Sequence, residues 1–156
     1  MLQKFFVSLF FILLIGAFPL SAANVSVLVI ETGLPNDNRG PHQYSIMWEN
    51  GLMDVYFEMG HIVSNSPITR INSITDGGFP FEVERFFDDA RETGMDYFVV
   101  AIIRHPVPFT VSLRVFNTNS HDMLKEITLT DNISLPQRDR MERIKDAVQE
   151  TYTWIR

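Results

Sequence analysis

Residues Asp96 to Arg104 read DYFVVAIIR, and this stretch carries the strongest strand signal of the sequence. Its apolar run leaves no polar face, which is typical of a strand buried on both sides in a parallel sheet. Asn24 to Glu31 (NVSVLVIE) is β-branched and almost as continuously apolar. The two stretches therefore predict the interior of a sheet that contains parallel neighbours.

The segments around these strands change to a helical period. Apolar residues recur at spacings of three and four in three stretches, and a pair of alternating segments predicts a hairpin with one wet face. The helical stretches are His42 to Met59, Pro80 to Gly94 and Ser134 to Ile155. The hairpin joins Phe109–Asn117 to Met123–Thr130. Between the first two helices, His61 to Val63 is a short strand. We predict one α/β domain over residues 24–156, a two-layer fold in which helices pack on a mixed sheet, in the order β-α-β-α-β-β-β-α.

The predicted core follows from these assignments. Five sheet residues should form its centre: Val27, Val29, Val99, Ala101 and Ile103. Helical residues should pack on them: Trp48, Leu52, Phe86, Ile144 and Val148.

The first 23 residues have the pattern of a secretory signal peptide. Lys4 precedes an apolar run from Phe5 to Ile15 that only Ser8 interrupts, and Ser21-Ala22-Ala23 supplies small residues for cleavage before Asn24. The run is shorter than the roughly 20 residues that span a bilayer. A retained N-terminal anchor is the alternative, but we expect export to the periplasm or the extracellular space without stable membrane insertion.

The amino-acid composition argues against some classes of binding partner. The formal net charge of −6 disfavours nucleic acid and anionic membrane surfaces. The chain has no cysteine, so we expect neither disulfides nor a lipidated cysteine. Small secreted animal domains usually contain disulfides, and their absence favours a bacterial source.

Two short motifs resemble a group of bacterial envelope domains. Gly94 to Val100 (GMDYFVV) resembles the start of a central strand in the N-terminal domain of TolB, in the curli secretion lipoprotein CsgG and in lipoprotein activators of penicillin-binding proteins. Leu113 to Thr118 and Met123 to Glu126 resemble their next hairpin, although Asn119 and Ser120 stand where a turn glycine is expected. The resemblance implies a domain that binds other envelope proteins and has no catalytic residues.

The polar residues themselves suggest no reaction. No two of His42, His61, His105 and His121 have the i, i+4 spacing of a helical zinc site, and no serine lies in a nucleophile elbow. Gly77-Gly78 is not part of a phosphate-binding glycine motif. We expect no catalytic residue, metal or cofactor.

Two loops are the candidate binding surfaces. Gly33 to Pro41 leaves the first strand at its carboxyl end, where open α/β sheets place ligands. Within it, Asn36, Asp37, Asn38 and Arg39 are candidates for contact with a partner. His121, in the predicted hairpin turn, is the fifth candidate. For the loop from Gly33 to Pro41 the alternative is a plain surface connection, and for His121 it is an isolated solvated or packed histidine.

Three functions remain open at this point. The first is a non-catalytic envelope protein that binds or scaffolds another envelope protein. The second is a periplasmic small-ligand-binding protein, which a pocket lined by Trp48 or Tyr44 would favour. The third is a hydrolase whose residues meet only in space, which requires a nucleophile and a base within hydrogen-bond reach.

We predict that the exported protein begins at Asn24, because the small residues before it suit signal peptidase. N-terminal sequencing of the protein from the culture medium or periplasm checks this. An intact Met1 in the membrane fraction would contradict it.

Overall fold

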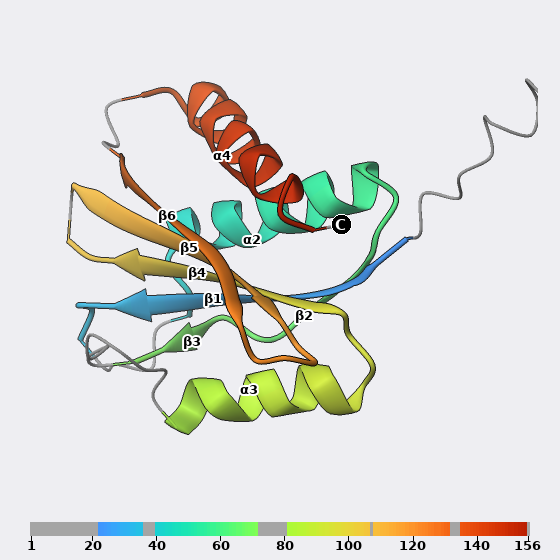
Figure 1. The fold of residues 1–156 in the computed structure, drawn as a ribbon. Coiled ribbons are helices and arrows are strands. Elements are labelled where there is room, and N and C mark those ends of the chain that lie inside the picture. The colour runs from blue at the N-terminus through green and yellow to red at the C-terminus, as the bar shows by residue number, and fades with distance from the viewer. Residues whose placement is uncertain (1–21, 36–39, 72–80, 107, 132–134, 156) are drawn as a thin grey trace, which may run out of the picture.

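A mixed sheet forms the middle of the computed structural model (Figure 1). Its interior strands are β1 (Asn24–Thr32) and β4 (Tyr97–Arg104), which run parallel over their whole length, from Val25–Tyr97 to Thr32–Arg104. β5 (Phe109–Asn117) and β6 (Met123–Asp131) continue the sheet beyond β4 as an antiparallel hairpin. Along the described residues the strand order is β2-β1-β4-β5-β6.

The other edge of the sheet is broken into two short strands. β2 (Ile62–Asn65) runs parallel to the first half of β1, and β3 (Thr69–Arg70) runs parallel to its second half. Pro67 lies in the gap between them, where a residue without an N–H cannot contribute to a ladder. The sequence predicted one strand here, and β3 is an addition to the predicted order.

The structure describes residues 22–35, 40–71, 81–106, 108–131 and 135–155, without the side chains of Phe81 and Glu82. The predicted signal segment, residues 1–23, therefore lies outside the described residues except for Ala22 and Ala23. The candidate binding residues Asn36, Asp37, Asn38 and Arg39 also lie outside them.

Helices cover both faces of the sheet. α2 (Gln43–Glu58) and α4 (Gln137–Tyr152) lie together on one face, and α3 (Phe81–Glu92) lies on the other (Figure 1). The predicted fold class, a single α/β domain with helices packed on a mixed sheet, is confirmed. The layer count differs, because the sheet is the middle of three layers and not one of two. The physical reason is that β1 and β4 are apolar on both sides and need cover on both.

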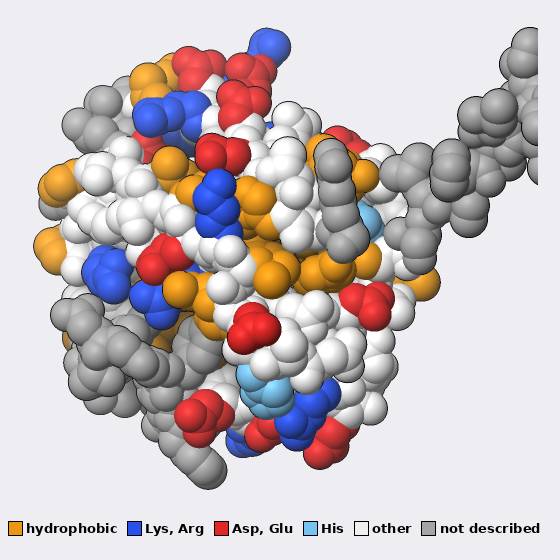
Figure 2. Space-filling model, viewed as in Figure 1, with side chains coloured by type: hydrophobic (Ala, Val, Ile, Leu, Met, Phe, Trp, Pro, Cys, Tyr) orange, Lys and Arg blue, Asp and Glu red, His pale blue; other side chains and the backbone are white. Residues whose placement is uncertain are grey.

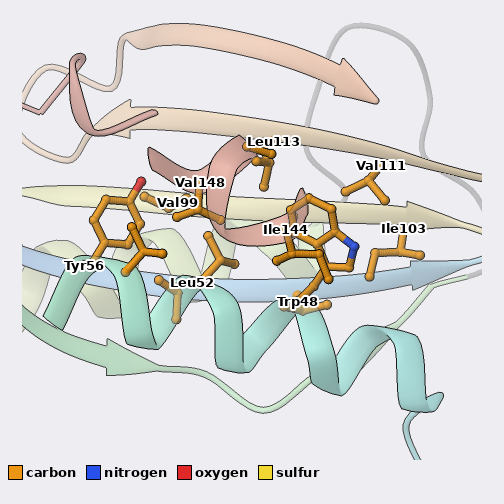
Figure 3. Close-up of a cluster of buried hydrophobic side chains, with 14 of the residues drawn as sticks. Trp48, Leu52, Tyr56, Val99, Ile103, Val111, Leu113, Ile144 and Val148 are labelled. Carbon is orange, nitrogen blue, oxygen red and sulfur yellow. The ribbon is translucent and has the colours of Figure 1, made fainter. Parts of the chain in front are cut away.

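The larger core lies between the sheet and the α2–α4 pair (Figure 3). All five predicted sheet residues belong to it, and so do Trp48, Leu52, Ile144 and Val148. Gly51 lies where α2 crosses α4, and a Cβ there would collide with the Ile144 side chain. A glycine inside a helix costs about 1 kcal/mol relative to alanine, and here it permits the close approach of α4.

The smaller core lies under α3. Val83, Phe87 and Ala90 on the helix face Leu28 and Ile30 of β1, and the rest of this core comes from Ile71, Phe98, Val100, Ile102 and Phe116. Phe86, which the sequence placed in the core, packs against this cluster from the side.

On this face the hairpin is polar beyond Phe116, and the residues of β6 are solvent-exposed, as predicted. Arg114 pairs with Glu126 across β5 and β6 at 2.9 Å, and the Oγ of the buried Ser112 lies 3.2 Å from Thr128 Oγ1. Because antiparallel sheets can expose one face to water, this half of the sheet needs no second helix layer.

Local signals set most of the helix ends. Gly60 and Gly94 follow α2 and α3 with φ of 86° and 76°, the left-handed conformation predicted for helix-ending glycines. α4 ends at Tyr152 rather than at Ile155, which is nonetheless buried in the larger core.

Val99→Asp should unfold the domain, because Val99 is fully buried in an interior strand and an unpaired buried charge costs several kcal/mol. Circular dichroism during heating checks this. Thr130→Asp, at an exposed position of β6, is the control. A Val99→Asp protein that melts like its parent would contradict the assignment of β4.

Candidate functional site

The carboxyl edge of the parallel strands is organised around one buried acid, Glu31. Its side chain is 1% exposed. Oε1 accepts a 2.6 Å hydrogen bond from the backbone N–H of His42, and Oε2 accepts bonds from Nε and Nη2 of Arg70 at 3.2 and 3.0 Å. Glu31 therefore ties the end of β1 to β3 and to the start of α2.

Arg70 extends this link into the loop that follows β1. Besides Glu31, its guanidinium donates to the carbonyl oxygens of Pro35 and Gly40, at 3.2 and 3.4 Å. These two residues border the predicted binding segment 36–39 on either side. The loop is thus anchored from both of its described ends by one side chain of β3.

The charge of Glu31 is stabilised despite burial. Burial raises its pKa, but the Ser45 hydroxyl, the His42 N–H and the Arg70 guanidinium lower it more strongly, so the pKa lies below its usual value. The carboxylate is therefore ionised at neutral pH, as a partner of Arg70 must be.

His42 and His105 meet at the same edge. Their rings lie 4.8 Å apart between centroids, and Phe109 packs edge-on against both. His42 caps α2, because its Nδ1 accepts the N–H of Tyr44 at 3.1 Å. No local spacing in the sequence connects these two histidines, because residues 42 and 105 come together only through the parallel pairing of β1 with β4.

Gly33 makes the approach of His105 possible. Its φ is 77°, and a Cβ on it would collide with the carbonyl oxygen of His105. His105 is 9% exposed, and its Nε2 has no hydrogen-bond partner within the described residues. Burial lowers the pKa of His105, and the neighbouring His42 lowers it further.

A cavity of about 270 Å³ opens beside this edge, between α4 and the end of β6. Tyr44 and Trp48 of α2 line it together with Leu129, Ile144 and Ala147. Tyr44 donates a 2.6 Å hydrogen bond to Asp131 Oδ2, and Arg143 pairs with Asp131 Oδ1 at 3.3 Å. This is the kind of pocket that would favour the small-ligand hypothesis.

His121 lies at the opposite end of the sheet. It sits in the β5–β6 turn with φ of 62°, its ring contacts Phe87 of α3, and its Nε2 lies 2.8 Å from Nη1 of Arg91. A hollow of about 310 Å³ lies there between Glu84, Phe87 and His121. The structure therefore does not bring His121 near Pro35 and Gly40, the described residues that flank the other predicted surface.

Two further observations concern the class of protein. Among the described residues, no group of three or more His, Asp and Glu side chains could hold a metal ion. No helix in that part of the chain combines the length and the apolar character needed to cross a membrane.

Comparison with known proteins finds similarity at the level of structure only. No protein family matches the chain, and no curated protein matches its sequence. Solved structures that resemble it include TolB from Acinetobacter baumannii, with 14% identity over 86% of this chain and a TM-score of 0.44. The chain spans 27% of the length of that TolB chain.

Two smaller proteins are also similar. A variant PelC dodecamer from Paraburkholderia phytofirmans has 11% identity, with 86% of this chain and 90% of that chain covered and a TM-score of 0.47. The LpoB C-terminal domain from Escherichia coli has 13% identity, with 72% and 85% covered and a TM-score of 0.43. TolB is also one of the proteins that the sequence motifs resemble, and all three likenesses concern the fold alone.

We predict that His105 makes the free energy of unfolding fall on acidification. Because its pKa is lowered in the folded protein, the unfolded chain binds this proton at a higher pH, and stability should decline as the pH drops below about 6.5. Urea unfolding between pH 8 and pH 5 checks this. His105→Phe should show a smaller decline than the parent, and an equal decline in both proteins would contradict the prediction.

Proposed function

We propose that this protein is an exported, non-catalytic protein of a bacterial cell envelope that binds another envelope protein. The signal pattern of residues 1–23 supports export, and the absence of cysteine supports a protein without a lipid anchor. The acidic net charge supports a protein partner over nucleic acid or an anionic membrane surface.

The observation that carries the proposal is the open edge of β6. This strand has nine residues and bonds to β5 on one side, and within the described residues no strand lies on its other side. Its first four residues are all exposed, and Met123 and Leu124 are 50% and 41% exposed. Such an edge presents unpaired N–H and C=O groups to which a partner can add a strand.

The opposite edge of the sheet is less suited to this role. β2 and β3 have four and two residues and are interrupted at Pro67. Short and interrupted edge strands are a common protection against strand addition. The asymmetry favours β6 as the binding edge.

The surface around β6 offers both apolar and polar contacts. Figure 2 shows hydrophobic side chains exposed across the middle of the face on which β6 and β5 lie in Figure 1. Charged side chains stand among them, and on the α3 side of the hairpin Arg114 and Glu126 form an ion pair. This mixture is typical of interfaces between proteins that also exist apart.

The two predicted loops remain separate parts of the proposal. His121 lies in the turn that leads into β6, so it can extend a surface centred on that strand. Pro35 and Gly40 lie at the other end of the sheet, and we propose the residues between them in the sequence, Asn36, Asp37, Asn38 and Arg39, as a second contact region. Loops that a rigid scaffold holds often carry recognition.

Small-ligand binding is the second candidate, and the cavity lined by Tyr44 and Trp48 favours it. The hydrolase hypothesis has no comparable support. Turnover of an ester, phosphate or glycosidic substrate by the purified protein, lost on one side-chain change, would overturn the non-catalytic part of the proposal.

Leu124→Lys should weaken capture of the envelope partner by about tenfold, the effect of losing about 1.4 kcal/mol of binding energy. A lysine on an edge strand opposes strand addition. Quantitative mass spectrometry of proteins captured from the organism's own envelope extract checks this.

Ile46→Lys is the matched control, because Ile46 is 40% exposed on α2, away from β6. Both variants should keep their stability within about 0.5 kcal/mol, as surface substitutions usually do. Equal capture by Leu124→Lys and its parent would reject the β6 edge.

A further inference from the structure

One face of β6 carries a row of four alternating residues. Lys125 lies over the ring of Trp154, with Nζ 4.9 Å from the ring centroid, and Asp131 is bonded to side chains of α2 and α4. Both ends of the row are therefore on the side of the sheet that these two helices cover. Between them, Ile127 and Leu129 pack against the larger core. The order along this face is one cation, two apolar side chains and one anion.

The anionic end of the row lies at the cavity between α4 and β6. Asp146 and Glu150 line this cavity together with Asp131, and Arg143 is the only basic residue among the described residues that line it. Three carboxylates thus stand against one guanidinium. A cationic side chain that entered from the open edge of β6 would be attracted by this net negative charge.

A second copy of the chain can supply the strand that covers this edge. Two identical edge strands related by a two-fold axis through the sheet run antiparallel, and each face of one sheet continues into the same face of the other. A residue of β6 then lies opposite a residue that points to the same face. Because faces alternate along the strand, only every second register satisfies this condition.

The charges of β6 exclude most of the allowed registers. An axis at Lys125 or at Glu126 would place two like charges directly opposite each other, which is destabilising. An axis at Ile127 would place the lysine opposite the apolar Leu129, and an axis at Leu129 would place Ile127 opposite the carboxylate of residue 131. Axes nearer either end of the strand would pair only a few residues.

An axis at Thr128 matches every residue of the row. Lys125 of each copy lies opposite Asp131 of the other, and Ile127 lies opposite Leu129, so that each pair occurs twice. Pairs of opposite charges and pairs of apolar side chains both stabilise neighbouring strands. Directly opposite residues lie about 5 Å apart, so the lysine of the second copy reaches the acidic cavity.

We propose that this protein forms a two-fold dimer in which the β6 strands of two copies pair about an axis at Thr128. The two sheets become one continuous sheet, and the cavity of each copy receives Lys125 from the other. This inference goes beyond the proposed function, since the strand that occupies the edge belongs to a second copy. A partner strand cannot occupy the same edge at the same time, so the dimer covers β6 until a partner replaces the second copy.

A disulfide cross-link tests the position of the axis. The chain has no cysteine, and Thr128 is exposed on β6 and lies opposite its own counterpart in the dimer. Oxidised glutathione should therefore link two Thr128→Cys chains, because opposite Cα atoms lie about 4.5–5.5 Å apart and a disulfide spans about 4.4–6.8 Å. Electrophoresis without reductant measures the linked fraction.

Thr130→Cys is the matched control for the cross-link. Thr130 is also exposed, on the same strand and the same face. In the dimer its counterpart lies four residues further along the paired strand, a separation of about 14 Å that a disulfide cannot span. This variant should remain unlinked under the conditions that link Thr128→Cys.

Sedimentation at increasing concentrations measures the dimer of the parent protein. Lys125→Glu should raise the dissociation constant about tenfold, because it places like charges opposite each other at two symmetric positions. Lys145→Glu is the matched charge reversal: Lys145 pairs with Asp54 and Glu58 on the α2 side of α4, and the dissociation constant should change little. Thermal melting identifies variants that remain folded, and the parent and Thr128→Cys decide the matter if a charge variant does not.

The outcomes separate the dimer from the proposed envelope partner. A parent protein that is still monomeric at about 1 mM, or equal cross-linking of Thr128→Cys and Thr130→Cys, would overturn the dimer. Equal dissociation constants for Lys125→Glu and Lys145→Glu would do the same, while the capture experiment tests the partner strand on its own. The disulfide-linked Thr128→Cys dimer should capture less partner than its reduced form, and equal capture would overturn the competition for β6.

Discussion

The carboxylate of Glu31 is the constraint on which the carboxyl edge of the sheet depends. A buried acid is tolerable only when cations and hydrogen-bond donors surround it. Here the donors come from Arg70 on β3 and from the backbone of His42 at the start of α2. The end of β1, the start of α2 and the strand β3 are thereby held to one point. Loss of the Arg70 guanidinium would leave the buried carboxylate without its ion-pair partner.

The two halves of the sheet meet different demands. In the parallel half, β1 and β4 are covered on both faces, by α2 and by α3, and most of their residues are apolar. In the antiparallel half only the α2–α4 face is covered, and the other face carries Arg114, Glu126 and Thr128. β5 still contributes Phe109, Val111, Leu113 and Val115 to the larger core, whereas β6 contributes only the partly buried Ile127 and Leu129. β6 can therefore keep an exposed edge.

Sequence patterns correctly predicted the elements in which neighbouring residues share one kind of environment, such as strands buried on both faces. DYFVVAIIR and NVSVLVIE predicted interior strands, and the apolar periodicity predicted the helices, because the cause lies within a few neighbouring residues. The third layer could have been inferred from the same strands, since apolar side chains on both faces require cover on both. The short strand β3 has only two residues and carries no periodicity that a pattern could detect. The contacts of Glu31 and His105 depend on parallel pairing between distant segments, which no local pattern contains.

The ends of the described chain lie close together. Figure 1 shows the start of β1 and the C-terminus near each other. Ala23 and Ile155 line the same hollow at the amino edge of the sheet, and the N–H of Ala23 donates to Nδ1 of His61 there. A short linker could join these ends, so a circularly permuted chain opened at the β5–β6 turn should keep every layer of the fold. Because both ends lie at the amino edge of the sheet, a fusion partner or a surface attached at either end would also lie at that edge. The Glu31 edge would then face away from the attached body.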